Sequence, residues 1–140
     1  MTDYKIIIPA RYNSKRFPGK PLVKIHGKTM LERVWLNAMD SAASEVIIAT
    51  DDQRIETIAR NFGAHVCVTS SEHKSGTDRI IEAIEILGLN DDEIILNVQG
   101  DEPLLGNKLM DECASLISGN EVCIGTLASP FNKGERLDDP

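Results

Sequence analysis

The amino-acid sequence predicts a doubly wound α/β fold built on a largely parallel sheet. Short runs rich in Ile and Val alternate along the chain with longer segments whose apolar residues recur at helical spacing. Consecutive apolar residues are typical of strands buried on both faces, and strands that alternate with helices form right-handed βαβ units. With 140 residues, 41% of them hydrophobic, the chain is large enough for one core. We therefore expect one α/β domain over residues 1–140.

The expected elements follow one another in a regular order. The first helix begins after a capping box formed by Thr29 and Glu32, while Gly63 and Gly88 end the second and third helices. Strands are expected at 5–9, 46–49, 65–69, 93–98 and 121–128, and helical stripes at 30–43, 55–62, 80–87 and 109–117.

Composition excludes several classes of protein. The 15 Lys and Arg residues against 22 Asp and Glu give a net charge of −7, and only 4% of the residues are aromatic, so a nucleic-acid surface is not expected. Three cysteines without a CxxC pair indicate neither a disulfide framework nor a structural zinc site. No apolar stretch approaches the roughly 18 residues of a membrane span, and the polar start MTDYK is unlike a secretory signal, so we expect a cytoplasmic protein.

The stretch ARYNSKRFPGK, directly after the first strand, concentrates positive charge in an acidic chain. Its cations are Arg11, Lys15, Arg16 and Lys20. Guanidinium and ammonium groups at a strand end suit a polyphosphate, and the Pro-Gly-Lys-Pro turn at 18–21 limits the entropy lost when they are ordered. The other interpretation is a solvated surface loop.

Two common phosphate-binding motifs are absent. Ser14 stands where the first glycine of a GxxxxGK[ST] loop would be, and no GxGxxG occurs in the chain. A P-loop NTPase and a dinucleotide-dependent dehydrogenase are therefore disfavoured.

Further polar clusters follow the later strands, at the sheet edge where open parallel sheets bind ligands. QGDEP places Asp101 and Glu102 after the fourth strand, where they either bind a hard cation such as Mg²⁺ or cap the next helix. HKSGTDR at 73–79 offers the Ser75 and Thr77 hydroxyls at a helix start, either for a base or phosphate or as an ordinary N-cap. A basic loop and an acidic strand end at one edge together suit phosphoryl chemistry.

These motifs resemble those of a known family. IPARYNSKRFPGKPL, ATDD, HKSGTDR and NVQGDEPL occur in order across residues 6–130, as in the CMP-Kdo synthetases, the 3-deoxy-manno-octulosonate cytidylyltransferases. RFPGK alone is typical of sugar nucleotidyltransferases in general, and the pair SGTDR and NVQGDEP narrows the resemblance to the Kdo branch.

The resemblance implies a Rossmann-like nucleotidyltransferase fold and a specific reaction. CMP would pass from CTP to 3-deoxy-D-manno-octulosonate (Kdo), giving CMP-Kdo and pyrophosphate for lipopolysaccharide biosynthesis, with Mg²⁺ as the cofactor. CTP and Kdo are thus the expected small-molecule partners.

The resemblance also implies roles for individual residues. Arg11, Arg16 and Lys20 would hold the triphosphate and stabilise the leaving pyrophosphate, and Asp101 would bind Mg²⁺; these four are the expected catalytic residues. The expected nucleotide-binding residues are Pro9, Ala10, Arg11, Arg16, Lys20, Ser75, Gly76, Arg79 and Gln99.

One departure from the family concerns the carboxyl end. The family's chains continue beyond Pro140, so we expect this chain to be truncated, with the rest of the sugar pocket, a second metal carboxylate and a homodimer contact in the remaining part. Two alternatives stay open. One is a cytidylyltransferase for sialic acid or 8-amino-Kdo, and the other is a CTP-binding fragment without turnover.

Overall fold

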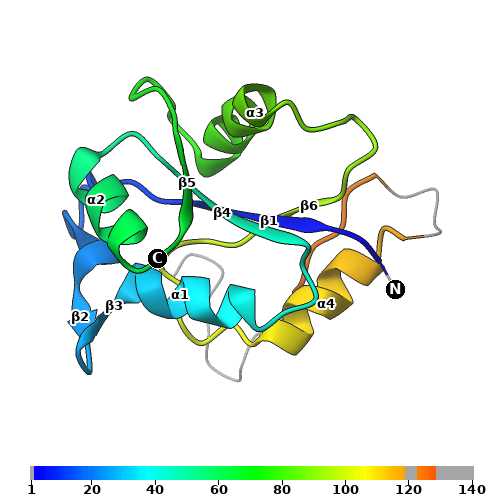
Figure 1. Ribbon diagram of the computed structural model, residues 1–140, viewed down its shortest axis with the longest axis horizontal. Helices are drawn as coiled ribbons and strands as arrows, with labels where there is room; N and C mark the ends of the chain where they lie inside the picture. The colour runs from blue at the N-terminus through cyan, green and yellow to red at the C-terminus, as the bar shows by residue number, and fades with distance from the viewer. Residues whose placement is uncertain (1, 119–122, 129–140) are drawn as a thin grey trace, which may run out of the picture.

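The central sheet is parallel, as the sequence predicts. The computed structural model describes residues 2–118 and 123–128. Its main strands are β1 (Lys5–Pro9), β4 (Glu45–Thr50), β5 (His65–Val68) and β6 (Ile95–Asn97), in the order β5-β4-β1-β6. Every neighbouring pair in this order is parallel, and the strands cross the centre of the molecule between layers of helix (Figure 1). The α/β fold class is therefore confirmed.

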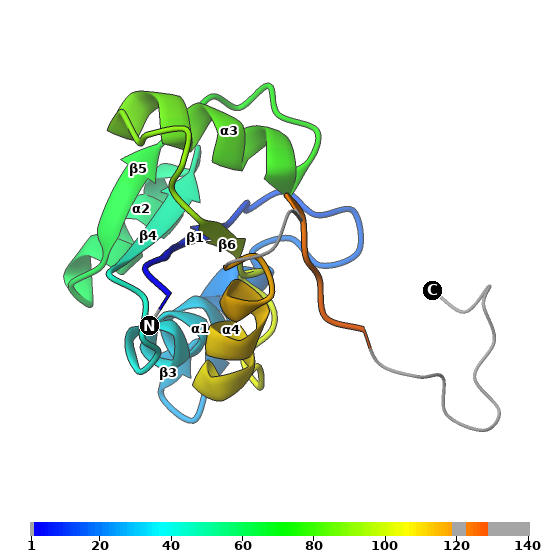
Figure 2. The ribbon, with the colours of Figure 1, turned by 90° about the vertical axis from the view of Figure 1, so that its right-hand side faces the viewer.

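Helices cover both faces of this sheet. They are α1 (Met30–Met39), α2 (Gln53–Asn61), α3 (Gly76–Leu87) and α4 (Asn107–Ser115). Apolar residues of α1, α2 and α4 share one buried cluster, whereas α3 contributes to a separate cluster on the opposite face. Figure 2 shows α1 and α4 below the sheet and α3 above it.

Strand β1 lies between two partner strands and contributes side chains to both clusters. Ile7 is opposite Ile47 of β4 on one side and Asn97 of β6 on the other. Alternate side chains of a strand point to opposite faces. Ile6 and Ile8 accordingly pack against α1, α2 and α4, and Ile7 packs against α3.

The first helix begins where the sequence predicts, directly after the Thr29 cap. The Thr29 hydroxyl accepts a hydrogen bond from the Glu32 N–H at 3.1 Å, while the Glu32 carboxylate pairs with Lys28. The first helix ends at Met39, not at residue 43 as predicted. The Ser41 hydroxyl donates to the Ala38 carbonyl at 2.6 Å, and this local bond satisfies one of the last carbonyls and turns the chain.

Two short elements follow the basic loop that no sequence pattern predicted. A 3₁₀ turn, η1, spans Lys20–Leu22, and an antiparallel hairpin joins β2 (Lys24–Ile25) to β3 (Lys28–Thr29). His26 and Gly27 both have positive φ in the hairpin turn. Strands of two residues are too short to show an alternating pattern, so periodicity could not detect them.

The strand predicted at 121–128 is wrong for the residues that the structure describes. Residues 121 and 122 lie outside the described ranges, and 123–128 form no strand. Ile124 is 85% exposed, and Gly125 lies beside Leu116 and Ile117, just after α4. The apolar sequence favours a strand, but a strand also needs a backbone partner, and this segment instead packs against another part of the chain.

The pKa of Tyr4 depends on how α4 packs against the start of the chain. Its side chain is 2% exposed, and its hydroxyl donates to Asp111 Oδ1 at 2.5 Å, which joins the start of β1 to α4. Burial, followed by the bond to Asp111, raises the pKa of Tyr4 to about 12.

We predict a loss of stability at alkaline pH that depends on Tyr4. The raised pKa stabilises the folded state below the unfolded pKa of about 10, and this contribution, roughly 2–3 kcal/mol, is lost as pH rises towards 12. Urea unfolding from pH 8 to 12 should show the loss in the wild type and a flatter profile in Tyr4→Phe. A wild-type minus Tyr4→Phe phenolate absorbance titration centred near pH 10 would contradict the prediction.

Candidate active site

A cavity of about 1120 Å³ opens beyond the carboxyl end of β1. Its wall comes from three segments: the basic loop, here residues 11–20, the start of α3, and the turn after β6. Every residue that the family resemblance implies as catalytic or nucleotide-binding lines it, whereas the two other candidates, Thr77 and Glu102, do not. The lining residues that the resemblance implies are Pro9, Ala10, Arg11, Arg16, Lys20, Ser75, Gly76, Arg79, Gln99 and Asp101. The structure thus brings the predicted residues together, while their individual roles stay predictions.

The free cations of the cavity lie on the basic loop. Arg11, Lys15 and Arg16 are exposed on the cavity wall, and no carboxylate in the described part of the chain pairs with them. Lys20 differs, because its Nζ lies 3.0 Å from Asp101 Oδ2 across the cavity. Both side chains of this pair are about half exposed, so it is weakly held and open to exchange with a ligand.

The start of α3 forms the wall opposite the basic loop. Ser75 is the N-cap, and its hydroxyl accepts from the Asp78 N–H at 3.1 Å and donates to Asp78 Oδ2 at 2.8 Å. Of the two interpretations of this motif, the structure shows the N-cap for the Ser75 hydroxyl. A Cβ on Gly76 would lie 3.2 Å from Pro9 Cγ, so a side chain there would require α3 or Pro9 to shift by a few tenths of an ångström.

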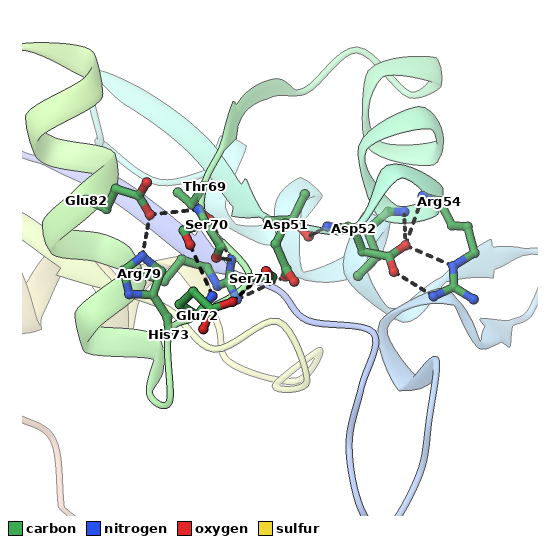
Figure 3. Close-up of polar contacts among 12 residues, drawn as sticks. Asp51, Asp52, Arg54, Thr69, Ser70, Ser71, Glu72, His73, Arg79 and Glu82 are labelled. Carbon is green, nitrogen blue, oxygen red and sulfur yellow. Dashed lines mark hydrogen bonds and ion pairs between the residues drawn. The ribbon is translucent and has the colours of Figure 1, made fainter.

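Arg79 is a buried part of the cavity wall, with its guanidinium already engaged. The residue is 4% exposed, its Nη1 donates to Thr69 Oγ1 at 2.5 Å and to the Ser70 carbonyl at 3.2 Å, and its Nη2 lies 3.0 Å from Asp51 Oδ1 (Figure 3). Arg79 thereby ties the loops after β4 and β5 to α3. The predicted contact of Arg79 with the nucleotide would thus have to use the parts of its side chain that are not already bonded to Thr69, Ser70 and Asp51.

A second polar contact joins the loop between β5 and α3 to that helix. His73 Nε2 contacts Glu82 Oε2, and the same oxygen accepts from the Ser70 N–H at 2.8 Å (Figure 3). The bond to His73, and then the one to Ser70, hold the pKa of Glu82 below its usual range. Sequence reasoning missed this pair, although Glu82 lies one helical turn and a half into α3 on the side that faces the loop.

Among the described residues, one carboxylate on the cavity wall could bind a metal. Asp101 lines the cavity, whereas no group of three or more His, Cys, Asp or Glu side chains within residues 2–118 and 123–128 could hold a metal ion. Mg²⁺ is commonly bound by one or two carboxylates together with substrate phosphates and water. Asp101 fits that pattern as a partial site that needs a phosphate ligand to complete it.

Comparison with protein families gives a decisive match at this point. Residues 5–140 match the family model described as cytidylyltransferase. The chain belongs to the cytidylyltransferase family. The family resemblance predicted from the motifs is therefore confirmed.

Curated relatives within this family share its sequence closely. The chain is 46% identical over 138 residues to the 3-deoxy-manno-octulosonate cytidylyltransferase of Ruthia magnifica, covering 99% of this chain and 57% of that protein. It is 47% identical over 140 residues to the enzyme of the same name from Pasteurella multocida, covering 100% of this chain and 54% of that protein. The chain thus spans about half the length of the curated relatives it matches.

Solved structures show the same fold. A CMP:2-keto-3-deoxy-manno-octonic acid synthetase complexed with CTP superposes with a TM-score of 0.76 at 38% identity, over 84% of this chain and 47% of that one. A cytidylyltransferase from Leptospira borgpetersenii superposes with a TM-score of 0.70 at 25% identity, over 86% of this chain and 50% of that one.

Within this cytidylyltransferase chain, Gly19 is the point where the basic loop closes. Its N–H donates to the Tyr12 carbonyl at 2.8 Å, its φ is 73°, and a Cβ there would lie 2.9 Å from Tyr12 Cε2. Gly27 has a similar φ of 81°, but nothing lies within 4 Å of its Cβ position. Comparing a substitution at each glycine therefore distinguishes the cost of backbone strain, which both share, from that of a side-chain clash, which only Gly19 has.

We predict that Gly19→Ala destabilises the protein more than Gly27→Ala. Both substitutions place a Cβ in the left-handed region, at a cost of about 1 kcal/mol. Gly19→Ala must also displace the Tyr12 ring, so its urea midpoint should fall further. Equal losses in the two variants would show that the Tyr12 ring yields freely.

Proposed function

We propose that the protein transfers CMP from CTP to Kdo, releasing pyrophosphate, in the supply of CMP-Kdo for lipopolysaccharide biosynthesis. The observation that carries the proposal is the cavity itself, where free cations of the basic loop face the Asp101 carboxylate. This arrangement suits a polyphosphate bound together with a divalent metal. Kdo as the acceptor rests on the names of the curated relatives, and CTP on the solved complex.

The basic loop would bind the triphosphate and act on the leaving group. In the reaction, an acceptor hydroxyl oxygen forms a bond to the α-phosphorus as the bond to the bridging oxygen of pyrophosphate breaks. Negative charge then accumulates on pyrophosphate. Arg11, Arg16 and Lys20 would stabilise that charge, because preformed cations in a cavity lower the barrier without reorganisation.

The opposite wall would bind the nucleoside. Pro9, Ala10, Ser75 and Gly76 lie where β1 ends against the start of α3, and their main chain would contact the cytosine edge. Gln99, whose Nε2 donates to Asn97 Oδ1 at 3.0 Å, would meet the sugar or the nucleotide. Arg79 would shape this wall through its bonds to the two neighbouring loops.

Asp101 would supply the protein's carboxylate to Mg²⁺. A bound divalent ion would neutralise phosphate charge in the cavity. When Asp101 binds the metal, its ion pair with Lys20 would break. Lys20 would then pair with the phosphates instead. Residues 1–140 would on this proposal form the nucleotide-binding domain of the protein.

Location and assembly belong to the same proposal. Among the described residues, no helix combines the length and the apolar composition that a bilayer crossing requires. We propose a cytoplasmic enzyme that acts as a homodimer and binds small-molecule substrates without nucleic acid.

The activity is tested by pyrophosphate release in the complete gene product. CTP and Mg²⁺ are incubated with Kdo, with 8-amino-Kdo or with N-acetylneuraminate, and we expect release with Kdo. Release with one of the other acceptors alone would replace Kdo by that sugar. Release without any acceptor would indicate CTP hydrolysis, and CTP binding without release would indicate a binding protein.

We predict that Lys20→Ala weakens CTP binding about tenfold or more while CMP binding changes little. A hydrogen bond between charged groups contributes roughly 1.5–3 kcal/mol, and Lys20 is expected at the outer phosphates. Lys28→Ala is the matched control, because Lys28 is similarly exposed and pairs with Glu32 outside the cavity. Titration calorimetry gives both affinities, and equal losses for CTP and CMP would contradict a place at the outer phosphates.

We predict that Asp101→Asn removes Mg²⁺-dependent turnover and leaves the fold intact. The ion pair that it breaks is exposed, so the urea midpoint should hardly change. In EDTA, CTP should bind the variant at least as well as the wild type, since Lys20 is released. The neighbouring Glu102→Gln is the control, and a loss of turnover confined to Glu102→Gln would assign the metal to that residue.

A further inference from the structure

Tyr12 belongs to the basic loop and contacts both Gly19 of that loop and Arg54 at the start of α2. Its ring lies against Gly19, where a Cβ would lie 2.9 Å from Cε2. The guanidinium carbon of Arg54 lies 3.3 Å from the centroid of the same ring. The Tyr12 carbonyl also accepts the Gly19 N–H, so one residue makes both contacts that close the loop.

Arg54 is itself fixed by Asp52. Its Nε donates to Asp52 Oδ1 at 3.0 Å and its Nη2 to Asp52 Oδ2 at 2.6 Å, and the Arg54 N–H also donates to Oδ1 at 2.9 Å (Figure 3). A bidentate pair holds a guanidinium in one plane. The fork also holds the pKa of Asp52 below its usual range, so the carboxylate stays charged. The planar group thus keeps its place on the ring although its side chain is 56% exposed.

The Tyr12 stack, defined here as Tyr12, Arg54 and Asp52, links the basic loop to the core. Asp52 is the N-cap of α2, and its side chain is only 15% exposed. Helix α2 is anchored by buried Ile55 and Ala59. The loop cations, by contrast, are exposed, and the stack is the rigid support beside them.

We propose that the Tyr12 stack is a positioning device, in which Tyr12, Arg54 and Asp52 fix the basic loop at Gly19 so that its cations meet the phosphates of the nucleotide. The inference rests on the proposed function for its ligand, and it assigns a role to the ATDD motif, which the proposed function leaves unused. None of the three residues lines the cavity. Their effect therefore reaches the ligand through the loop.

The first test measures the loop without any ligand. Arg54→Gln should increase the hydrogen exchange rate of the Gly19 amide several-fold, as measured by NMR. Arg60→Gln is the matched control: Arg60 lies on the same helix, is 53% exposed and forms a comparable ion pair with Glu56. It should leave the Gly19 amide unchanged.

The second test measures ligand affinity in the complete gene product by calorimetry. An exposed cation–π contact is worth a two- to fivefold change in an equilibrium, so Arg54→Gln should weaken CTP binding by about that factor. Cytidine binding should not change, because cytidine has no phosphate to meet the loop. Tyr12→Phe keeps the ring and should retain wild-type CTP affinity, whereas Tyr12→Leu should lose at least as much as Arg54→Gln.

Asp52→Asn separates positioning from simple charge. Asparagine caps a helix as well as aspartate does, so α2 should be preserved. Removing a negative charge should tighten CTP binding if charge alone matters. If the stack positions the loop, loss of the bidentate Asp52–Arg54 pair should instead weaken CTP binding. Weaker CTP binding is the result that we expect.

These experiments can refute the positioning role and the proposed function separately. A wild-type protein that binds no CTP would overturn the proposed function, while the Gly19 exchange rates would still decide whether the stack holds the loop. CTP binding that is equally affected in Arg54→Gln and Arg60→Gln, or tightened in Asp52→Asn, would overturn the positioning role alone.

Discussion

The central position of β1 determines where every part of the cavity lies. Because β1 pairs in parallel with both β4 and β6, the chain leaves these strands at the same edge of the sheet. The basic loop leaves β1 and Asp101 follows β6, so both line the cavity, while Asp51 and Asp52, which follow β4, lie at the same sheet edge without lining it. Ile6, Ile7 and Ile8, all fully buried, hold β1 in this place by packing against helices on both faces. The site therefore depends on a buried strand that contributes few of its functional groups.

Charge at the cavity opposes the charge of the chain as a whole. The net charge is −7, yet the basic loop presents Arg11, Lys15 and Arg16 without carboxylate partners in the described residues. Around them, two carboxylates are paired with permanent cations: Asp52 with Arg54, and Asp101 with Lys20. Nearby negative charge is thus partly neutralised, and the field at the loop stays favourable for an anion.

Sequence patterns predicted the layers of the fold, the basic loop and the acidic strand end because these depend on local signals, whereas Pro9, Ala10 and Gln99 were expected at the site only from the family resemblance. Apolar runs identified the four parallel strands, and the Thr29 cap is seen as predicted. The Arg79–Asp51 pair and the Arg54 contact with Tyr12 join residues far apart in the chain, so no local pattern reveals them. The strand predicted over 123–128 was wrong for a related reason, since strand propensity does not indicate whether a neighbouring strand is available to pair with.

The burial of Arg79 has an evolutionary consequence. Its guanidinium lies against Asp51, Thr69 and Ser70; an apolar residue there would leave the Asp51 carboxylate without its charge partner, and a lysine would keep the charge but lose the planar fork that reaches all three groups. A change at position 79 is thus tolerable mainly when position 51 changes with it. Among related sequences, these two positions should covary as a pair, whereas the exposed cations of the basic loop should vary, or be retained, according to the ligand alone.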